Sequence, residues 1–221
     1  MDKIKRHPER ARTERAQLDA VLDAAAMGTL ATVVDGMPWA VPLLYARDGD
    51  RILLHGSTGA GALRHVAAGA PAVLCVAMLD GIVVADTLFD SSANYRSAVV
   101  RGNLVTLDED DSAGALSVLS DGLIPGRSRE VREHRRKELA ATLALALPIS
   151  PGQWTVKVRD APPSEPTESN SAWAGVVPMR SVAGLPVPAP WVAPGTPVPA
   201  SVSRLVESAR EDKQLAWRAG I

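Results

Sequence analysis

The stretch from Asp50 to Val76 constrains the fold most, because it reads as a strand, a small-residue turn, a short helix and a second strand. Six small residues, Gly56–Gly61, separate the strand-like Arg51–His55 from the helical pattern of Ala62–Ala67; we call them the elbow. Small side chains let a ligand approach the main chain, and hydroxyls and helix N-terminal amides favour a phosphate. The elbow lacks Walker or Rossmann spacing, so a flexible loop followed by a capped helix stays open as the alternative.

The charge balance gives no reason to expect a nucleic-acid or membrane partner. The 221 residues fit one domain, or one domain with an extended tail, and carry a net charge of −1. The locally basic amino-terminal run is interpreted as a solvated helix face; it comprises Lys3, Lys5, Arg6, Arg10, Arg12 and Arg15. We found neither a signal peptide nor an apolar run long enough for a bilayer, and so expect a cytoplasmic location.

Cysteine and histidine usage argues against a dedicated metal centre. Cys75, the single cysteine, lies inside the apolar run Ala72–Met78, which predicts a buried thiol. No paired His or Cys residues stand at ligand spacing, so no zinc site is expected. His55 and His65 lie close enough in sequence to border one groove, where either a ligand contact or a structural role fits His55 and a structural role is favoured for His65.

Short apolar runs between turn residues predict an antiparallel sheet. Asp35-Gly36 and Asp48-Gly49-Asp50 are hairpin signals, and Asp80-Gly81 reads as a turn or a bulge. The predicted strands are Thr29–Val34, Pro38–Ala46, Ile52–His55, Ala72–Ala85, Tyr95–Leu107, Thr142–Ile149 and its hairpin partner Trp154–Arg159. The predicted helices, besides the one after the elbow, are Glu9–Ala26, Ser112–Gly122, Arg129–Leu139 and Ser201–Arg210.

Composition changes at Asp160, after which prolines recur and regular structure should become sparse. Trp173 and Trp191 are the expected anchors of this segment. The predicted organisation is therefore a helical segment over 1–26, a barrel domain over 27–160 and a proline-rich segment over 161–221 that packs on the barrel.

Four local strings, in this order, resemble the pyridoxamine 5′-phosphate oxidase-like family with the FMN-binding split barrel, in particular the branch of nitroimidazole-resistance proteins. The resemblance covers roughly residues 14 to 185, and the strings are specific together rather than singly. They are Pro38-Trp39-Ala40-Val41-Pro42, Leu54-His55-Gly56-Ser57, Asn94-Tyr95-Arg96-Ser97-Ala98-Val99-Val100 with Gly102, and Trp173-Ala174-Gly175-Val176-Val177-Pro178.

The resemblance implies a mainly β fold, a six-stranded antiparallel split β-barrel with flanking helices, paired into a homodimer with FMN in grooves between the subunits. The flavin ring would lie along Trp39, Ala40 and Val41. The remaining cofactor contacts that it implies are His55, Gly56, Ser57, Thr58, Gly61, Ala62, Arg96, Ser97 and Trp173.

One departure from the family pattern concerns the flavin phosphate. Relatives usually carry a basic residue near Gly61, whereas this chain has no cation between Gly56 and Leu63. Arg64 would have to reach back to replace it, and a lost charged contact costs about 1.5–3 kcal/mol, or tenfold to hundredfold in affinity.

Three functions remain open: an FMN-dependent oxidoreductase acting on a small molecule, a flavin-binding protein without turnover, and a repurposed split barrel that binds heme through His55 or His65 or uses no cofactor. The first is preferred, because a flavin carries the redox chemistry and the chain shows no catalytic acid–base constellation. The small-molecule substrate, the electron donor and the catalytic residues are left unnamed.

Overall fold

The computed structural model describes residues 7–59, 61–166 and 172–210. Its centre is an antiparallel sheet in the order β1-β9-β6-β5-β2-β3-β4-β8-β7, with β10 paired to β5 outside this path. The predicted mainly β fold with peripheral helices is confirmed. The described residues form ten strands where six were expected: seven longer strands, the two-residue strands β1 and β7 at the two ends of the path, and β10 beside β5.

The first half of the chain follows the predicted hairpins. After η1 (Pro8–Arg10) and β1 (Ala11–Arg12), α1 (Arg15–Asp23) leads into β2 (Met27–Val34), β3 (Met37–Asp48) and β4 (Arg51–Ser57). Asp35 and Gly36 both have positive φ, as the hairpin signal requires. The helix expected over Glu9–Ala26 is wrong at both ends. Ala11 and Arg12 pair with β9 before it begins, and it ends at Asp23.

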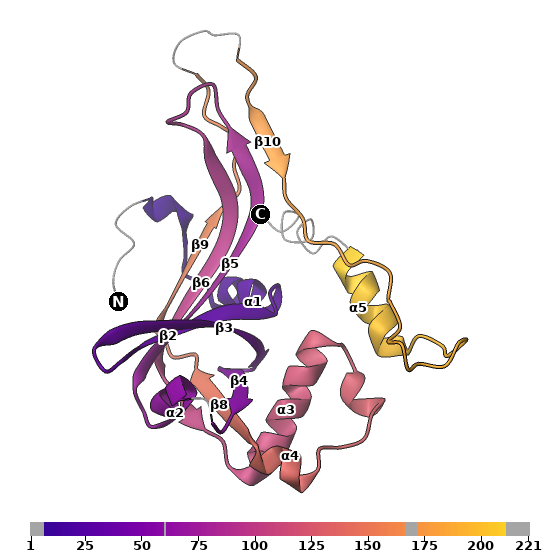
Figure 1. Ribbon diagram of the computed structural model, residues 1–221. Coiled ribbons are helices and arrows are strands. Elements are labelled where there is room, and N and C mark those ends of the chain that lie inside the picture. Colours follow the sequence, from indigo (N-terminus) through magenta and orange to yellow (C-terminus); the bar gives the residue numbers. More distant parts are fainter. Residues whose placement is uncertain (1–6, 60, 167–171, 211–221) are drawn as a thin grey trace.

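α2 (Gly61–Ala67) follows the elbow and leads into the longest hairpin, formed by β5 (Pro71–Val84) and β6 (Ser92–Asn103). The register shifts between Leu79 and Gly81, so Asp80-Gly81 is a bulge rather than a turn. The distal half of this hairpin, with β10 (Gly175–Pro178) beside it, projects from the barrel in Figure 1; we call this three-stranded projection the arm. The predicted strand to Leu107 ends at Asn103 and resumes as β7 (Val105–Thr106).

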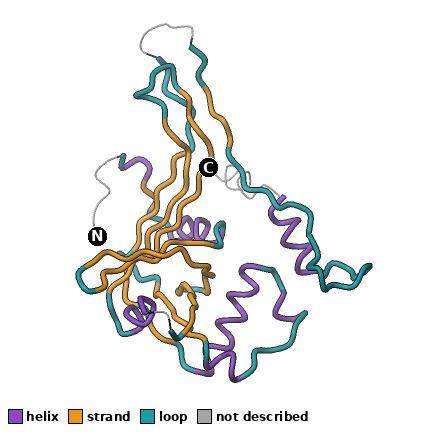
Figure 2. Tube along the Cα trace, viewed as in Figure 1, coloured by secondary structure: helices purple, strands orange, loops and turns teal. Residues whose placement is uncertain are grey.

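Helices gather at the end opposite the arm (Figure 2). α3 (Glu109–Leu123), predicted over Ser112–Gly122, is capped by Asp108, whose carboxylate accepts a hydrogen bond from the amide of Asp111. The helix expected over Arg129–Leu139 is wrong: this part holds only η2 (Arg127–Arg129) and α4 (Arg136–Ala140). Its residues carry charges of both signs and are mostly exposed, so no apolar face holds a longer helix on the core.

β8 (Thr142–Pro148) and β9 (Trp154–Arg159) are strands as predicted, but they do not pair with each other. β8 pairs with β4 and β7, whereas β9 pairs with β6 and β1, on the other side of the sheet. An ideal Cβ on Gly102 of β6 would lie 3.2 Å from Leu147 Cδ1 of β8, so the two strands approach where the sheet curls round. Leu54, Leu74, Val100 and Leu145 fill the core between them.

The carboxyl-terminal segment departs from the barrel after β10 and returns through α5 (Ala200–Arg210), one residue longer than predicted. The amide of Ser201 donates to Glu130 Oε1 at 2.8 Å, and Arg204 Nη2 donates to the carbonyl of Pro125 at 2.9 Å. These bonds dock α5 beside the segment that follows α3. Trp173 and Trp191 are exposed, so this chain's own residues leave both predicted anchors largely uncovered.

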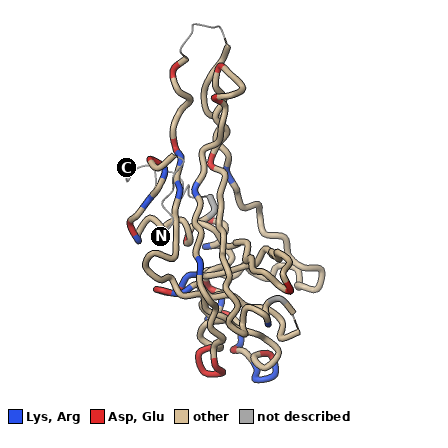
Figure 3. The backbone as a smooth tube through the Cα atoms, turned by 90° about the vertical axis from the view of Figure 1, so that its left-hand side faces the viewer, with Lys and Arg blue, Asp and Glu red and all other residues tan. Residues whose placement is uncertain are grey.

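Charges are interspersed along most of the chain in Figure 3, with acidic and basic groups meeting at the lower end, where α3 begins and α4 lies. Arg136 Nε lies 3.4 Å from Glu109 Oε1 there. Of the basic amino-terminal run, Lys3, Lys5 and Arg6 lie outside the described residues. Arg10 ends η1, Arg12 lies in β1 and Arg15 begins α1, so the described members do not share one helix face. None of the helices in the described ranges is long and apolar enough to span a membrane.

Candidate functional site

The elbow joins a strand to a helix as predicted, but β4 continues to Ser57, α2 begins at Gly61, and Ala60 lies outside the described residues. Two of its amides are already used within the chain. The amide of Thr58 donates to the carbonyl of Ala141 at 3.3 Å, and the amide of Gly59 donates to Ser57 Oγ at 3.2 Å. The hydroxyl hydrogens of Ser57 and Thr58 remain available as donors. Because α2 is only seven residues long, the helix contributes little field of its own, and an anion here would depend on hydroxyls and Arg64.

The two elbow glycines that were predicted to contact the cofactor differ in what surrounds them. An ideal Cβ on Gly56 would lie 2.2 Å from Leu63 Cδ1, so Gly56 allows α2 to pack closely on β4. Gly61 has nothing within 4 Å of its ideal Cβ and is exposed. Ala62 follows in the first turn of α2. Arg64 is exposed, and no acidic side chain in the described part of the chain pairs with it.

The strand predicted to lie along the flavin ring has two different faces. Trp39 and Val41 point inward and pack against the core, whereas Ala40 points outward and is exposed. Ala40 is directly opposite Ala31 on β2, so these two small side chains lie side by side on the outer face of the sheet. That outer face continues onto β5 at Cys75, which is exposed; the expectation of a buried thiol is wrong.

Arg96 and Ser97 do not form a pair at the elbow, because neighbouring residues of a strand point to opposite faces. Arg96 is buried and its guanidinium is bonded to Asp80. Arg96 is also directly opposite Met78, which lies roughly 23 Å along β5 from its start at a rise of about 3.3 Å per residue. Its described contacts therefore hold the arm together, whereas Ser97 is half-buried on the outer face opposite Ala77.

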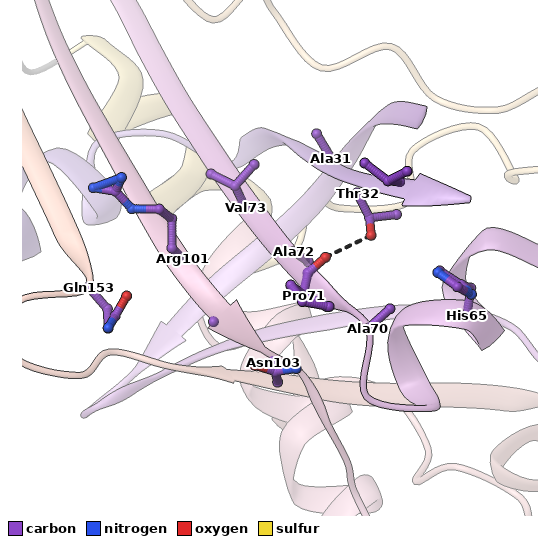
Figure 4. A pocket seen from close by; sticks show the side chains of 12 residues that line it. Ala31, Thr32, His65, Ala70, Pro71, Ala72, Val73, Arg101, Asn103 and Gln153 are labelled. Carbon is purple, nitrogen blue, oxygen red and sulfur yellow. Dashed lines mark hydrogen bonds between the residues drawn. The ribbon is translucent and has the colours of Figure 1, made fainter. Parts of the chain in front are cut away.

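A cavity of about 590 Å³ opens on the outer face, between β2, the end of α2, the start of β5 and the end of β6. Figure 4 shows His65 at one end and Arg101 with Gln153 at the other. Thr32 Oγ1 donates to the carbonyl of Pro71 at 2.7 Å and ties β2 to β5 along its floor. The lining residues are Ala31, Thr32, Val33, His65, Ala70, Pro71, Ala72, Val73, Arg101, Gly102, Asn103 and Gln153.

The two candidate histidines do not border the same cavity. His65 is half-buried and lines the cavity, whereas His55 is exposed on β4 opposite Ala144 and does not line it. Arg101 lies within the predicted strand Tyr95–Leu107 but was not among the predicted cofactor contacts. Asn103 and Gln153 carried no sequence signal, since both come to the cavity through the pairing of β6 with β5 and β9.

A second cavity, of about 420 Å³, lies between α1, β3 and α3. Its cation, Arg47, forms a bidentate pair with Asp23, with Nε–Oδ1 at 2.8 Å and Nη2–Oδ2 at 2.5 Å. Across the described ranges, no group of three or more His, Cys, Asp or Glu side chains is placed to hold a metal ion.

Comparison with known proteins gives two close structural likenesses. The FAD and heme binding protein from Mycobacterium smegmatis is 45% identical, with a TM-score of 0.88 over 89% of this chain and 97% of that one. The flavocytochrome Anf3 from Azotobacter vinelandii is 31% identical, with a TM-score of 0.85 over 91% and 94%. Both likenesses extend well past the barrel, because each covers about nine-tenths of this chain.

A proposed 5-nitroimidazole antibiotic resistance protein from Bacteroides thetaiotaomicron is 15% identical, with a TM-score of 0.56 over 67% of this chain and 86% of that one. This similarity shows the split-barrel fold alone and does not single out the nitroimidazole-resistance branch. No protein with a curated description matches the chain.

A family model described as pyridoxamine 5′-phosphate oxidase matches residues 14–157, which include every strand from β2 to β8 and most of β9. The antiparallel sheet, the elbow after β4 and this family match all indicate a split barrel. The chain belongs to the pyridoxamine 5′-phosphate oxidase family of split-barrel proteins.

Proposed function

We propose that the protein is a homodimeric redox protein that binds FAD and heme. The observation that carries the proposal is the likeness to two proteins described as FAD- and heme-binding and as a flavocytochrome, at 45% and 31% identity over nearly the full length of each. A likeness of this extent continues past residue 157, where the family model ends, into the carboxyl-terminal segment.

The elbow favours FAD over the FMN that the family resemblance implies. A single phosphate at the elbow would meet the two hydroxyls of Ser57 and Thr58 and the side chain of Arg64, without a cation in the elbow itself. FAD adds a pyrophosphate and an adenosine, whose contacts elsewhere make binding less dependent on that one cation. The flavin ring keeps its predicted place along Trp39, Ala40 and Val41.

Flavins exchange one or two electrons and heme exchanges one, so a protein that holds both can connect a two-electron donor to a one-electron acceptor. The chain's own contribution is to bind and orient the two groups and to exclude water from them. The protein is therefore proposed to be an oxidoreductase that acts on a small molecule.

Homodimer formation is supported by apolar surface that this chain does not cover. Met27, Val33 and Met37 of the β2–β3 hairpin are all more than half exposed. An isologous interface over this hairpin would remove these apolar side chains from water.

The visible spectrum of the purified protein tests the proposal. Two flavin bands and a Soret band are expected, with FAD rather than FMN released on acid denaturation. Sedimentation equilibrium should give a dimer at micromolar concentration. A protein that takes neither flavin nor hemin from solution, or that binds them as a strict monomer, contradicts the proposal.

A further inference from the structure

We propose that the cavity between His65 and Arg101 is the heme site, with His65 as the axial ligand of the iron and Arg101 as the partner of a heme propionate. The inference rests on the proposed function for the presence of heme. It adds the site and its ligands, which the size, lining and charge of the cavity support.

The cavity has the size and lining of a site for a flat apolar ligand. Its volume of about 590 Å³ lies within the range of about 300–1,000 Å³ typical of ligand pockets. The floor is made of small or branched apolar side chains, among them Ala31, Val33 and Val73, which project from neighbouring strands of one sheet face. Small side chains on this sheet face leave room in the cavity for a planar macrocycle.

His65 supplies the one group that the iron needs. Its imidazole lies at the edge of the cavity in Figure 4, and within the described part of the chain it makes no side-chain hydrogen bond or ion pair. A neutral imidazole is the commonest axial ligand of heme iron. His7, by contrast, is 3.1 Å from Glu9, and neither His55 nor His134 lines the cavity.

The charge of the lining suits a porphyrin that carries carboxylates. No Asp or Glu lines the cavity, and its cation is Arg101. No acidic side chain of the described ranges pairs with Arg101, so its guanidinium can donate two hydrogen bonds to a propionate. Asn103 is already engaged, because its Nδ2 donates to the carbonyl of Gly69 and fixes the turn after α2.

The cavity also adjoins the strand predicted to lie along the flavin ring. Ala31, on its floor, is directly opposite Ala40 of β3, and directly opposite residues on paired strands have Cα atoms about 4.5–5.5 Å apart. Heme in this cavity would therefore lie next to the flavin strand, where one-electron exchange between the two groups is efficient.

The experiment titrates hemin into the intact dimer of the wild type, His65→Ala and the matched control His55→Ala. We expect His65→Ala to bind hemin at least tenfold more weakly, to lose the iron–histidine stretching mode of the ferrous protein in resonance Raman spectra, and to regain the wild-type absorption spectrum when imidazole is added. His55→Ala should behave like the wild type. Flavin absorbance and the melting temperature should be unchanged in both, which separates loss of the ligand from loss of the fold.

Two further variants test the cavity without touching the ligand. Arg101→Gln should weaken hemin binding and leave the iron–histidine mode in place. Ala31→Phe fills the floor and should block hemin, whereas Ala77→Phe, on the same sheet face but outside the cavity lining, should not. Sedimentation equilibrium confirms that each variant is still a dimer.

A wild type that binds hemin with histidine ligation, together with a His65→Ala variant that keeps that ligation, overturns the inference and leaves the proposed function intact. A wild type that takes up flavin but no hemin overturns the heme part of the proposed function and the inference with it. Loss of ligation in His55→Ala alone moves the site to β4 and overturns the inference.

Discussion

Arg96 and Asp80 form a buried bidentate ion pair across the β5–β6 hairpin, with Nε–Oδ2 at 2.9 Å and Nη2–Oδ1 at 2.8 Å. The two side chains are 5% and 9% exposed. Asp80 occupies the bulge at which the register of β5 shifts. The ion pair therefore holds the base of the arm, and an arginine that the family resemblance assigned to a phosphate is structural in its described contacts.

Removing one partner of this pair should destabilise the protein strongly. Arg96→Ala leaves the Asp80 carboxylate buried without its guanidinium, at a cost of about 3–5 kcal/mol. Urea denaturation of Arg96→Ala and of the double variant Asp80→Leu/Arg96→Met measures this cost, and the double variant should recover much of the stability because no charge stays buried. Equal losses in the two variants would show that packing, rather than an uncompensated charge, dominates.

Flavin binding to Gly61→Arg tests the missing cation of the elbow. Gly61 has open space around its ideal Cβ, so an arginine fits without strain. A new charged contact is worth about 1.5–3 kcal/mol, which predicts a tenfold to hundredfold lower Kd for FMN and a smaller gain for FAD. Flavin fluorescence quenching gives both constants. Gly61→Gln is the uncharged control, and an equal gain in that variant would exclude an electrostatic cause.

Local signals in the sequence identified the turns and most strands, because these depend on neighbouring residues. Asp35-Gly36 adopts the positive φ angles of a tight hairpin, and the strand Trp154–Arg159 has its predicted bounds. Pairing was harder to predict. Trp154–Arg159 follows Thr142–Pro148 after a short turn, yet the two strands join opposite sides of the sheet. Their pairing partners are distant in the sequence, so local signals do not reveal them.

The candidate site shows the same division between local and long-range information. The elbow was visible as a run of small residues, whereas the cavity depends on Ala31, His65, Arg101 and Gln153, which come together only through the β2–β5–β6–β9 pairing. Cys75 was predicted to be buried because its run is apolar. It is exposed because its strand turns one face outward.

Tyr45→Phe should loosen α1. The phenol of Tyr45 is buried and donates to the carbonyl of Leu22 at 2.6 Å, in the last turn of α1. Losing this bond leaves a buried helix-end carbonyl without its partner, at a cost of about 1–2 kcal/mol by urea denaturation.

The alkaline limb of the stability curve gives a second readout for Tyr45. Burial, and then the charge of Asp23, raise the pKa of Tyr45 above its ordinary value of 10.0. The unfolded chain therefore ionises first, and this contribution is lost as pH rises from the ordinary value through the raised one. Tyr45→Phe should lack that part of the alkaline decline; a decline identical to that of the wild type would contradict the assignment.

Docking of α5 should weaken in acid. The hydroxyl of Ser201, and then its amide, lower the pKa of Glu130 below the ordinary 4.5. The stabilisation is therefore present above that ordinary value and is lost as pH falls through the lowered pKa. In NMR spectra from about pH 6 to about pH 3, the amide signal of Ser201 should shift with the titration of Glu130. Glu130→Gln should abolish the shift, and a control, Glu133→Gln, should retain it.

Trp173→Ala should weaken flavin binding more than it lowers the melting temperature. Trp173 is 66% exposed in this chain, and its described packing is on Gly175, where an ideal Cβ would lie 2.8 Å from Cζ2 of the indole. Gly175 begins β10, and it is opposite Val84 on the arm.

The small burial of Trp173 within the chain predicts a small loss of stability for Trp173→Ala, under about 1 kcal/mol. Trp173 lies at the far end of the arm, where its exposed indole has its surface free for a ligand or a second subunit. Flavin titration, differential scanning calorimetry and sedimentation equilibrium on the same variant separate these roles. Weaker flavin binding with an unchanged melting temperature and an intact dimer supports contact with the cofactor, whereas unchanged flavin affinity with a lower melting temperature would assign Trp173 to packing.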